Sequence, residues 1–221
     1  MNHPPDPAPH KPLSPEALRY PPPPWRLSGT MWSGLFPTHH RPRVPRGLSV
    51  LLPRHLVIAA IRYLDGDLRY NEFLIAGLVR RGNRIGPYVH HIWVDSPVSQ
   101  VGGREIWGLD KQLARFDWTD RQVRITTDLG TQITLTAGRE PRAAAPLMLP
   151  LPVFTPVAGN LTYAVARARL HAGPTRLSLP HWPDELPRLS DHTTRLALEV
   201  PHFHAAMPAP RPVPEAARSR P

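Results

Sequence analysis

The chain of 221 residues carries a formal net charge of +10 at neutral pH and has no cysteine. Its length fits one domain of ordinary size, and the lack of cysteine excludes disulfides and thiolate metal sites. No apolar stretch reaches the roughly 20 residues that span a bilayer, and the N-terminus lacks the charged start and apolar run of a signal peptide. We therefore expect a cytoplasmic protein with no membrane partner.

The positive charge is carried almost entirely by arginine. Of the 27 basic side chains only Lys11 and Lys111 are lysines, which leaves 27 − 2 = 25 arginines. Most of these arginines stand singly along the chain, for example at Arg62, Arg84 and Arg124, and they do not cluster on one helix. Scattered charge predicts only nonspecific, salt-sensitive attraction to nucleic acid, so we expect no specific nucleic-acid partner.

Proline marks both ends of the chain. Residues 1–24 end in a run of four prolines, and residues 206–221 are rich in proline, alanine and arginine. Such runs cannot donate backbone hydrogen bonds and favour extended polyproline structure. We expect a disordered or surface-wrapping tail at residues 1–24, one folded domain at residues 25–205 and a disordered tail at residues 206–221.

Between the tails the pattern is mostly that of β-strands. Residues Trp25–Trp32 alternate large apolar with small or polar side chains, and Ser96 and Pro97 begin a short helical or turn segment that ends at Gly108. The proline-rich stretch Pro146–Pro156 predicts a buried crossing segment. The other expected strands are, in chain order, His55–Tyr63, Tyr70–Arg80, Pro87–Asp95, Leu113–Trp118, Arg121–Thr127, Thr131–Thr136, Leu161–Leu170, Thr175–Leu179 and Leu196–Val200. Many short strands with few short helices indicate a mainly β (α+β) fold, either a barrel or a sandwich.

Lys111 stands out because lysine is so rare in this chain. Lys11 lies in the N-terminal tail, whereas Lys111 lies in the middle of the folded part, before a strand-like run. A guanidinium does not deprotonate in proteins, but a buried lysine can become a neutral amine that attacks a carbonyl. A lysine left over from a coding bias toward arginine is the plainer alternative, and the residue count alone does not decide between the two.

Histidines near the C-terminus are the best candidates for metal ligands. His202 and His204 lie two residues apart and therefore share one face of a strand, which suits a metal site in a β protein. No carboxylate or third histidine stands at a matching spacing. We therefore expect no metal site.

Three short motifs support a family resemblance. Arg104 and Glu105 follow two glycines, and Lys111 comes six residues after Glu105; upstream stands Tyr70-Asn71-Glu72, and downstream stands Gly173-Pro174-Thr175-Arg176-Leu177. In this order and spacing they resemble the core of the acetoacetate decarboxylase family over roughly residues 25 to 200. The Arg-Glu to Lys spacing is fairly specific, and the other two motifs are individually weak.

The resemblance implies a closed, cone-shaped β-barrel, homo-oligomeric assembly and no cofactor. It implies that a lysine inside the barrel forms an imine with a β-keto acid, so that carbon dioxide leaves and an enamine remains. Carried onto this sequence, it makes Lys111 the nucleophile and Glu72 the acid/base or substrate-positioning carboxylate. The plain alternative for Glu72 is a surface carboxylate at the end of a strand.

The chain also departs from the family pattern. Gln112 stands where the family has a second lysine, Thr30 stands near a family arginine, and Val57 stands near a second active-site glutamate. We expect Gln112, Thr30 and Arg104 to contact the substrate, although an internal salt bridge between Arg104 and its neighbour Glu105 is the simpler interpretation for Arg104. Asp110 replaces a proline and is expected to point away from Lys111, because neighbours in an extended segment face opposite sides.

These expectations favour a lyase that acts on a keto acid or a related carbonyl compound through a Schiff base on Lys111. An aldolase or a dehydratase that acts through the same imine is a variant of this reading. A barrel that binds a small ligand without turnover is the alternative from another class, motivated by the altered family residues. A basic protein associated with nucleic acid is a weaker third possibility.

Overall fold

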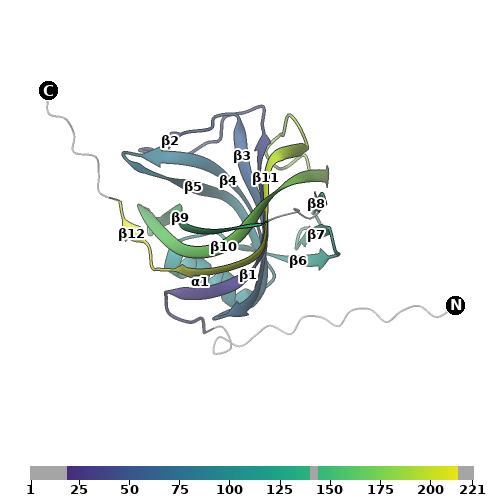
Figure 1. The fold of residues 1–221 in the computed structure, drawn as a ribbon. Helices are drawn as coiled ribbons and strands as arrows, with labels where there is room; N and C mark the ends of the chain where they lie inside the picture. The colour runs from purple at the N-terminus through teal and green to yellow at the C-terminus, as the bar shows by residue number, and fades with distance from the viewer. Residues whose placement is uncertain (1–18, 140–143, 214–221) are drawn as a thin grey trace, which may run out of the picture.

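The computed structural model describes residues 19–139 and 144–213. Within these ranges the chain forms one 12-stranded sheet and a single α-helix, α1 (Pro97–Trp107), as Figure 1 shows. No helix in the described part of the chain is long and apolar enough to cross a membrane. The strands are β1 (Trp25–Pro37), β2 (Ser49–Val50), β3 (His55–Gly66), β4 (Tyr70–Arg81), β5 (Arg84–Val94), β6 (Gln112–Trp118), β7 (Gln122–Thr127), β8 (Gln132–Ala137), β9 (Ala145–Val157), β10 (Asn160–His181), β11 (Thr193–Met207) and β12 (Arg211–Pro212).

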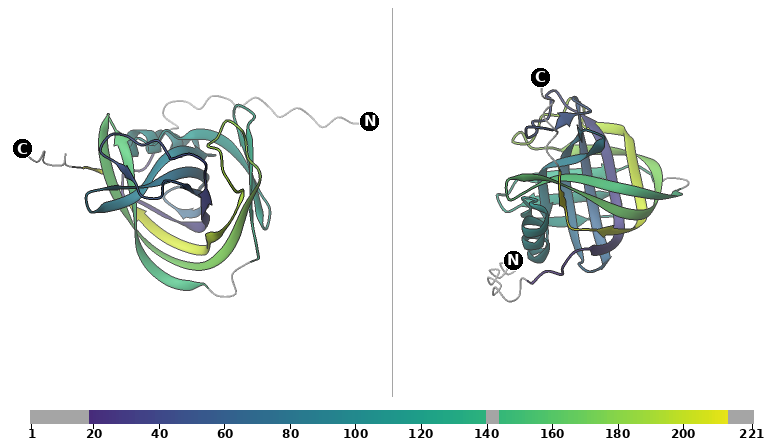
Figure 2. Two further views of the ribbon diagram at one scale, coloured as in Figure 1. Left: turned by 90° about the horizontal axis from the view of Figure 1, so that it is seen from above. Right: turned by 90° about the vertical axis from the view of Figure 1, so that its left-hand side faces the viewer.

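The sheet closes on itself. Its strand order is β2-β4-β3-β1-β11-β10-β8-β7-β6-β5-β9. The additional pairing β4–β5 joins the two end regions of this order to each other, and β10–β9 joins the last strand to the middle. Seen from above, the strands curve around a common centre (Figure 2). The prediction of a closed, mainly β fold with little helix is therefore confirmed.

Side chains that alternate along each strand face two different interiors of the sheet. On β3, Leu56 and Ile58 are buried in a packed hydrophobic core, whereas Val57 and Ala59 face the opposite side and line a cavity. Successive side chains of a strand point to opposite faces, so one sheet supplies both interiors. We call the first interior the packed core; its members include Trp32, Phe36, Leu56, Ile58, Phe73, Ile75, Trp93, Ile125, Ile133, Leu135, Leu177 and Leu179.

The strand β10 differs from its prediction. The segments Leu161–Leu170 and Thr175–Leu179, expected as separate strands, are parts of one 22-residue strand. Its first half pairs with β9 and its second half with β8, while β11 accompanies it along most of its length. The irregularity between His171 and Gly173 bends this strand without ending it.

The proline-rich stretch Pro146–Pro156 is not a buried crossing segment. It forms β9, and its first residues are exposed, including Met148 at 74 %. Pro146, Pro150, Pro152 and Pro156 all occupy even positions, and alternate residues direct their N–H groups to opposite edges of a strand. The missing N–H groups therefore fall on one edge, and the odd-numbered residues remain free to pair with β10.

Ordered structure extends beyond the expected C-terminal boundary. The strand β11 continues to Met207, and β12 pairs with β10, so the boundary predicted at residue 205 falls inside a strand. At the other end, Trp25 donates its indole N–H to the carbonyl of Pro21 at 2.7 Å, which holds the chain before β1 against the fold. The remaining parts of both expected tails lie outside the described residues.

Candidate active site

Lys111 lies between the end of α1 and the start of β6. The helix ends at Gly108, whose left-handed conformation (φ 64°) lets its N–H bond back to the carbonyl of Arg104. The returning chain places the Lys111 stem against Gly103, where a Cβ atom would lie only 2.6 Å from Cδ and Cε of the lysine. Glycine at this helical position therefore makes the space that Lys111 occupies.

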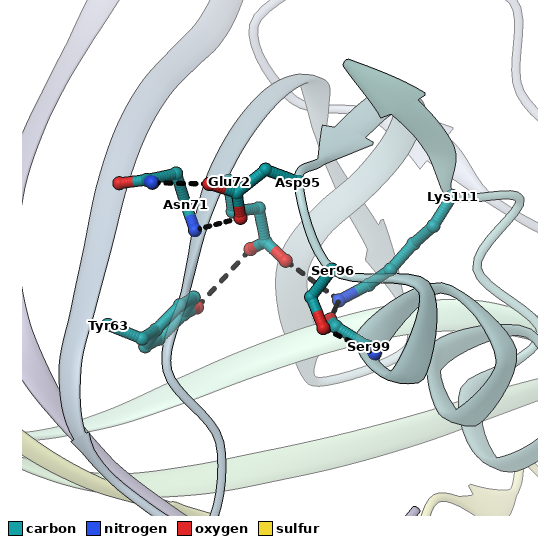
Figure 3. A network of polar contacts seen from close by, with 7 residues as sticks. All are labelled: Tyr63, Asn71, Glu72, Asp95, Ser96, Ser99 and Lys111. Atoms are coloured by element: carbon teal, nitrogen blue, oxygen red, sulfur yellow. Dashed lines mark hydrogen bonds and ion pairs between the residues drawn. The ribbon is translucent and has the colours of Figure 1, made fainter. Parts of the chain in front are cut away.

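The Lys111 amine is held by two hydrogen bonds inside the protein. Its Nζ donates to Oε2 of Glu72 at 2.8 Å and to Oγ of Ser99 at 3.0 Å (Figure 3). The amine also lies 5.0 Å from the centre of the Tyr70 ring, within reach of a cation–π contact. The Lys111 and Glu72 side chains are only 4 % and 7 % exposed, so the amine and the carboxylate form a buried ion pair.

Two elements converge on this pair. Glu72 comes from β4, where the hydroxyl of Tyr63 on the neighbouring β3 donates to its second oxygen, Oε1, at 3.2 Å. Ser99 comes from the first turn of α1, whose N-cap Ser96 accepts the Ser99 N–H at 3.2 Å. The proline that follows Ser96 suits the first helical position because it lacks only an N–H that would have no helical partner. Strand pairing and helix capping therefore fix the amine from both sides.

The electrostatics keep Lys111 protonated in the free protein. Burial by itself lowers the pKa of the Lys111 amine, but the carboxylate of Glu72 and the contacts with Tyr70 raise the pKa by more, so it lies above the ordinary lysine value. Burial raises the pKa of Tyr70 to about 12 and raises the pKa of Tyr63 well above its ordinary value. At neutral pH the site therefore contains the Lys111 ammonium group and two neutral phenols beside Glu72.

A cavity of about 330 Å³ opens beside the ion pair. Its polar lining groups are Ser33 and the cluster of Tyr63, Tyr70, Glu72 and Lys111. Its other walls are apolar and come from β1, β3, β4, β5, α1 and the α1–β6 connection, β9, β10 and β11: Trp25, Leu27, Met31, Val57, Ala59, Ile61, Leu74, Pro87, Val89, Ile92, Trp107, Leu109, Leu151, Pro152, Val153, Ala166, Leu170, Phe203, Ala205 and Met207.

The structure brings together Lys111 and Glu72 but not the three residues expected to contact the substrate. Gln112 and Arg104 lie on the outer surface, where both contact the exposed carboxylate of Asp110, at 3.0 and 3.3 Å. Thr30 is absent from the cavity lining, which β1 supplies through Met31 and Ser33. The reason is alternation: Gln112 follows Lys111 and Thr30 precedes Met31, so both turn to the opposite face.

The structure also places the other residues near Lys111 that the sequence singled out. Val57 lines the cavity, and Asp110 points outward as expected. Arg104 does not form the expected internal salt bridge with Glu105, because Arg104 pairs with Asp110 and Glu105 accepts a hydrogen bond from the Tyr20 hydroxyl. These two side chains lie next to each other on a helix and so point in different directions.

Three polar residues of the site were not among the predicted site residues. Tyr70 begins the Tyr-Asn-Glu motif, and the strand pairing places Tyr63 directly opposite it. Ser99 stands four residues before Gly103 on α1, so the two share the helix face that meets Lys111. The four-residue helical spacing between Ser99 and Gly103 was an available sequence signal for Ser99, whereas the position of Tyr63 depends on the β3–β4 register, which the sequence alone does not give.

Histidines do not add a metal centre to the described part of the chain. His202 and His204 share a face, as expected, and their Nε2 atoms lie 2.7 Å apart. The described residues contain no group of three or more histidine, cysteine or acidic side chains that could hold a metal ion.

Comparison with known proteins supports the architecture. The structure resembles acetoacetate decarboxylase from Legionella pneumophila subsp. pneumophila str. Philadelphia 1, with a TM-score of 0.70, 20% identity and coverage of 88% of this chain and 89% of the other. It also resembles an acetoacetate decarboxylase-like enzyme from Sphingomonas wittichii RW1, with a TM-score of 0.58, 15% identity and coverage of 91% and 96%.

A third similar structure is the enduracididine biosynthesis enzyme MppR complexed with the condensation product of pyruvate and imidazole 4-carboxaldehyde. Its TM-score is 0.60, its identity is 16%, and the match covers 91% of this chain and 94% of the other. At these identities the three structures establish the fold. No curated protein sequence matches the chain.

The family assignment comes from the sequence itself. The family model for acetoacetate decarboxylase (ADC) matches residues 9–190, which is most of the chain and includes β1, α1, the buried ion pair and all of β10. The chain therefore belongs to the acetoacetate decarboxylase family.

Proposed function

We propose that this protein is a lyase that decarboxylates a β-keto acid through a Schiff base on Lys111. The observation that carries the proposal is the buried Lys111–Glu72 pair at the polar end of an otherwise apolar cavity. A buried amine beside a carboxylate, next to a space for a small molecule, is the arrangement that imine chemistry needs.

Glu72 supplies the first proton acceptor. Because Lys111 rests as an ammonium group, it must lose a proton before it attacks, and Oε2 of Glu72 is the carboxylate oxygen 2.8 Å from Nζ. A substrate carboxylate near Glu72 raises the affinity of Glu72 for a proton through like-charge repulsion. Substrate binding therefore helps to convert the ion pair into a neutral amine and a carboxylic acid.

The reaction then proceeds with balanced electrons and protons. The Nζ lone pair bonds to the ketone carbon, and the proton held by Glu72 leaves with the ketone oxygen as water, which gives a protonated imine. The electrons of the bond to the carboxylate move toward the iminium nitrogen, carbon dioxide leaves, and an enamine remains. Glu72 takes one proton from solvent and gives it to the enamine carbon, and water then releases the ketone and returns Lys111 as its ammonium form. Overall, one proton is consumed and one carbon dioxide is formed for each β-keto acid.

The remaining polar groups position the two reacting side chains. Tyr63 binds the Glu72 oxygen that faces away from the amine, and Ser99 accepts one amine hydrogen. Both phenols stay neutral at physiological pH because burial raises their pKa values. They can therefore donate hydrogen bonds without adding a negative charge that would compete with Glu72.

Borohydride reduction tests the proposal. The protein is incubated with a panel of β-keto acids, reduced, digested and analysed by mass spectrometry. We expect a reduced adduct on Lys111, with none on Lys111→Arg, because a guanidinium does not form the imine. Folded protein that gives no adduct with any member of the panel, or gives it on another residue, would disprove the proposal.

The same imine supports a second reaction class. MppR, which shares the fold, binds a condensation product of pyruvate and an aldehyde, and an enamine on Lys111 could likewise add to an aldehyde instead of a proton. The cavity volume of about 330 Å³ favours this alternative, because it has room for a second reactant. Product analysis after mixing a keto acid with an aldehyde distinguishes the two: free ketone indicates the lyase, and a new carbon–carbon bond indicates the aldolase.

Binding without turnover is the alternative from another class. The raised pKa of Lys111 favours it, because the free protein keeps the amine as an ammonium ion. In that case Lys111→Arg would leave ligand affinity nearly unchanged and no wild-type adduct would form.

Self-association is proposed separately. The strand β9 exposes Leu147, Met148 and Leu149 along an apolar edge, and such surfaces commonly lie at interfaces. Sedimentation of the wild type and of Met148→Ser would show whether this edge joins copies of the chain.

A further inference from the structure

The cavity has one polar end and a long apolar body. Tyr63, Tyr70, Glu72 and Lys111 gather at one end, and the remaining walls are aliphatic or aromatic apart from Ser33. Lys111 and Glu72 are the only charged side chains among the described residues that line it. A ligand that fills this space must therefore present its reacting carbonyl at one end and hydrocarbon along the rest.

The strand register gives the length of the apolar body. Ile61 of β3 pairs with Glu72 and so lies level with the ion pair, and Ala59 pairs with Leu74 one step farther along. Val57 lines the cavity two residues beyond Ala59. At a rise of about 3.3 Å per residue, the wall from Ile61 to Val57 extends about 13 Å from the level of the amine. Acetoacetate is too short to contact the far part of this wall.

The charges give the second argument. Lys111 and Glu72 balance each other, so the cavity offers an entering anion no net positive charge. Arg104, the nearest candidate in the motif, is on the outer surface and paired with Asp110. A carboxylate that leaves water for such a site loses hydration without gaining a free cation. Contacts elsewhere on the ligand must offset this cost, and the apolar walls can provide them only to a hydrocarbon chain.

Resting on the Schiff-base function proposed above, we propose that the substrates are β-keto acids with a medium-length apolar acyl chain, rather than acetoacetate. The carbonyl reaches Lys111 while the chain lies along Ile61, Ala59 and Val57 toward β9 and β11. The apolar surroundings also favour the reaction step itself, because the charge of the carboxylate is lost as neutral carbon dioxide departs. The bond changes are those given above: one proton enters, carbon dioxide leaves, and the product is a methyl ketone with the same chain.

A chain-length series tests this inference. Carbon dioxide release and borohydride labelling of Lys111 are measured with 3-oxobutanoate, 3-oxohexanoate, 3-oxooctanoate and 3-oxodecanoate. Each methylene that moves from water into the cavity is expected to raise kcat/KM about fourfold, until the cavity is full. A flat series, or one highest for 3-oxobutanoate, with Lys111 labelled, would overturn the inference and leave the Schiff-base function standing. The lack of any adduct on Lys111 with all four acids would overturn both.

Two cavity variants locate the chain. Ala59→Leu fills the middle of the apolar body and is expected to lower the ratio of kcat/KM for 3-oxodecanoate to that for 3-oxobutanoate by about tenfold or more. Val57→Phe, at the far end, gives a second test should the first variant fold poorly, which thermal denaturation would reveal. Met148→Ser changes an exposed apolar residue outside the cavity and is expected to leave the ratio unchanged. An unchanged ratio in folded Ala59→Leu and Val57→Phe would contradict the proposed path of the chain.

Discussion

Two buried ion pairs lie on opposite faces of the same curved sheet. Arg121 donates to both oxygens of Glu199, at 2.8 and 2.7 Å, and its guanidinium lies 5.5 Å from the ring centre of Trp32 in the packed core. On the cavity side, Lys111 donates to a single oxygen of Glu72 at 2.8 Å. Both carboxylates are nearly inaccessible, with side-chain exposures of 9 % and 7 %.

The difference between the pairs is chemical. The planar guanidinium of Arg121 matches the carboxylate with two parallel bonds and keeps its proton at every accessible pH. The Lys111 amine shares its hydrogens between Glu72 and Ser99, borders a cavity and can give up a proton. A chain with 25 arginines therefore places one of its two lysines where proton loss would be useful. A nearly inaccessible carboxylate therefore holds a doubly bonded arginine on one face and a lysine amine beside a cavity on the other.

We call Lys111–Glu72 the cavity pair and Arg121–Glu199 the structural pair. The largest expected effect comes from giving the cavity pair the arginine that the structural pair has. Lys111→Arg keeps a cation beside Glu72 but replaces the amine with a group that does not lose its proton. We expect kcat to fall by about 10⁴-fold or more, as for loss of a covalent nucleophile, and borohydride labelling of residue 111 to disappear. Turnover within about tenfold of the wild type would exclude Lys111 as the nucleophile.

Removing the negative charge of the cavity pair should lower turnover and, at the same time, make the Lys111 amine easier to deprotonate. In Glu72→Gln, kcat is expected to fall by about 10² to 10⁴, the range for loss of a general acid or base. The pKa of Lys111 should fall, because the carboxylate that raises it is gone and burial still lowers it. Amidination of Lys111 should therefore begin at lower pH in the variant, with Lys11 as an internal reference. A pH dependence that matches the wild type would contradict the electrostatic role of Glu72.

The reverse exchange tests the structural pair. Arg121→Lys preserves the charge but loses one of the two parallel bonds to Glu199, and also the planar contact with Trp32. We expect the free energy of unfolding to fall by about 1.5 kcal/mol, the value of one hydrogen bond to a charged group. Urea denaturation measures this change, and kcat per folded molecule should match the wild type. A large fall in kcat would show that the two faces of the sheet are coupled.

Much of this arrangement follows from local sequence patterns. The turn at residues 65–67, the cap at Ser96 and the spacing from Glu105 to Lys111 predict that a hairpin, a helix and a lysine follow one another, and the family motifs bring Glu72 to that lysine. The alternation of Val57 and Ala59 with Leu56 and Ile58 also predicts that β3 has two apolar faces. Apart from the meeting of Glu72 and Lys111, which the family resemblance implies, each of these features depends on neighbouring residues alone.

The direction in which each side chain points could not be predicted in the same way. The family motif predicts Gln112 in the pocket, where the family has a second lysine, yet a shift of one residue turns a strand side chain to the opposite face. Tyr63 reaches Glu72 because the β3–β4 register sets Tyr63 opposite Tyr70 and Ile61 opposite Glu72. The exposure of β9 depends on which partner covers each of its edges. These features depend on pairing between distant segments, which a single sequence does not specify.

High pH should distinguish the two ion pairs through the slope of the unfolding free energy against pH. Tyr70 has its pKa raised from 10.0 to about 12, and the pKa of Lys111 is raised above 10.5. Both groups hold their protons more tightly in the folded state, so the stability they contribute is complete below their ordinary pKa values and is lost as pH rises through the folded values. For Tyr70 this window extends from pH 10.0 to about 12.

Within that window, Tyr70→Phe should therefore make the decline in unfolding free energy shallower, by up to about 1.4 kcal/mol per pH unit. Glu199→Gln is the matched control. It weakens the structural pair at every pH but should retain the wild-type slope, because Arg121 does not titrate there. Urea denaturation in steps between pH 10 and 12 measures both slopes. Equal slopes for Tyr70→Phe and the wild type would mean that alkaline unfolding starts away from the cavity. Stability measurements would then no longer support the contrast between the cavity pair, which can release a proton, and the structural pair, which cannot.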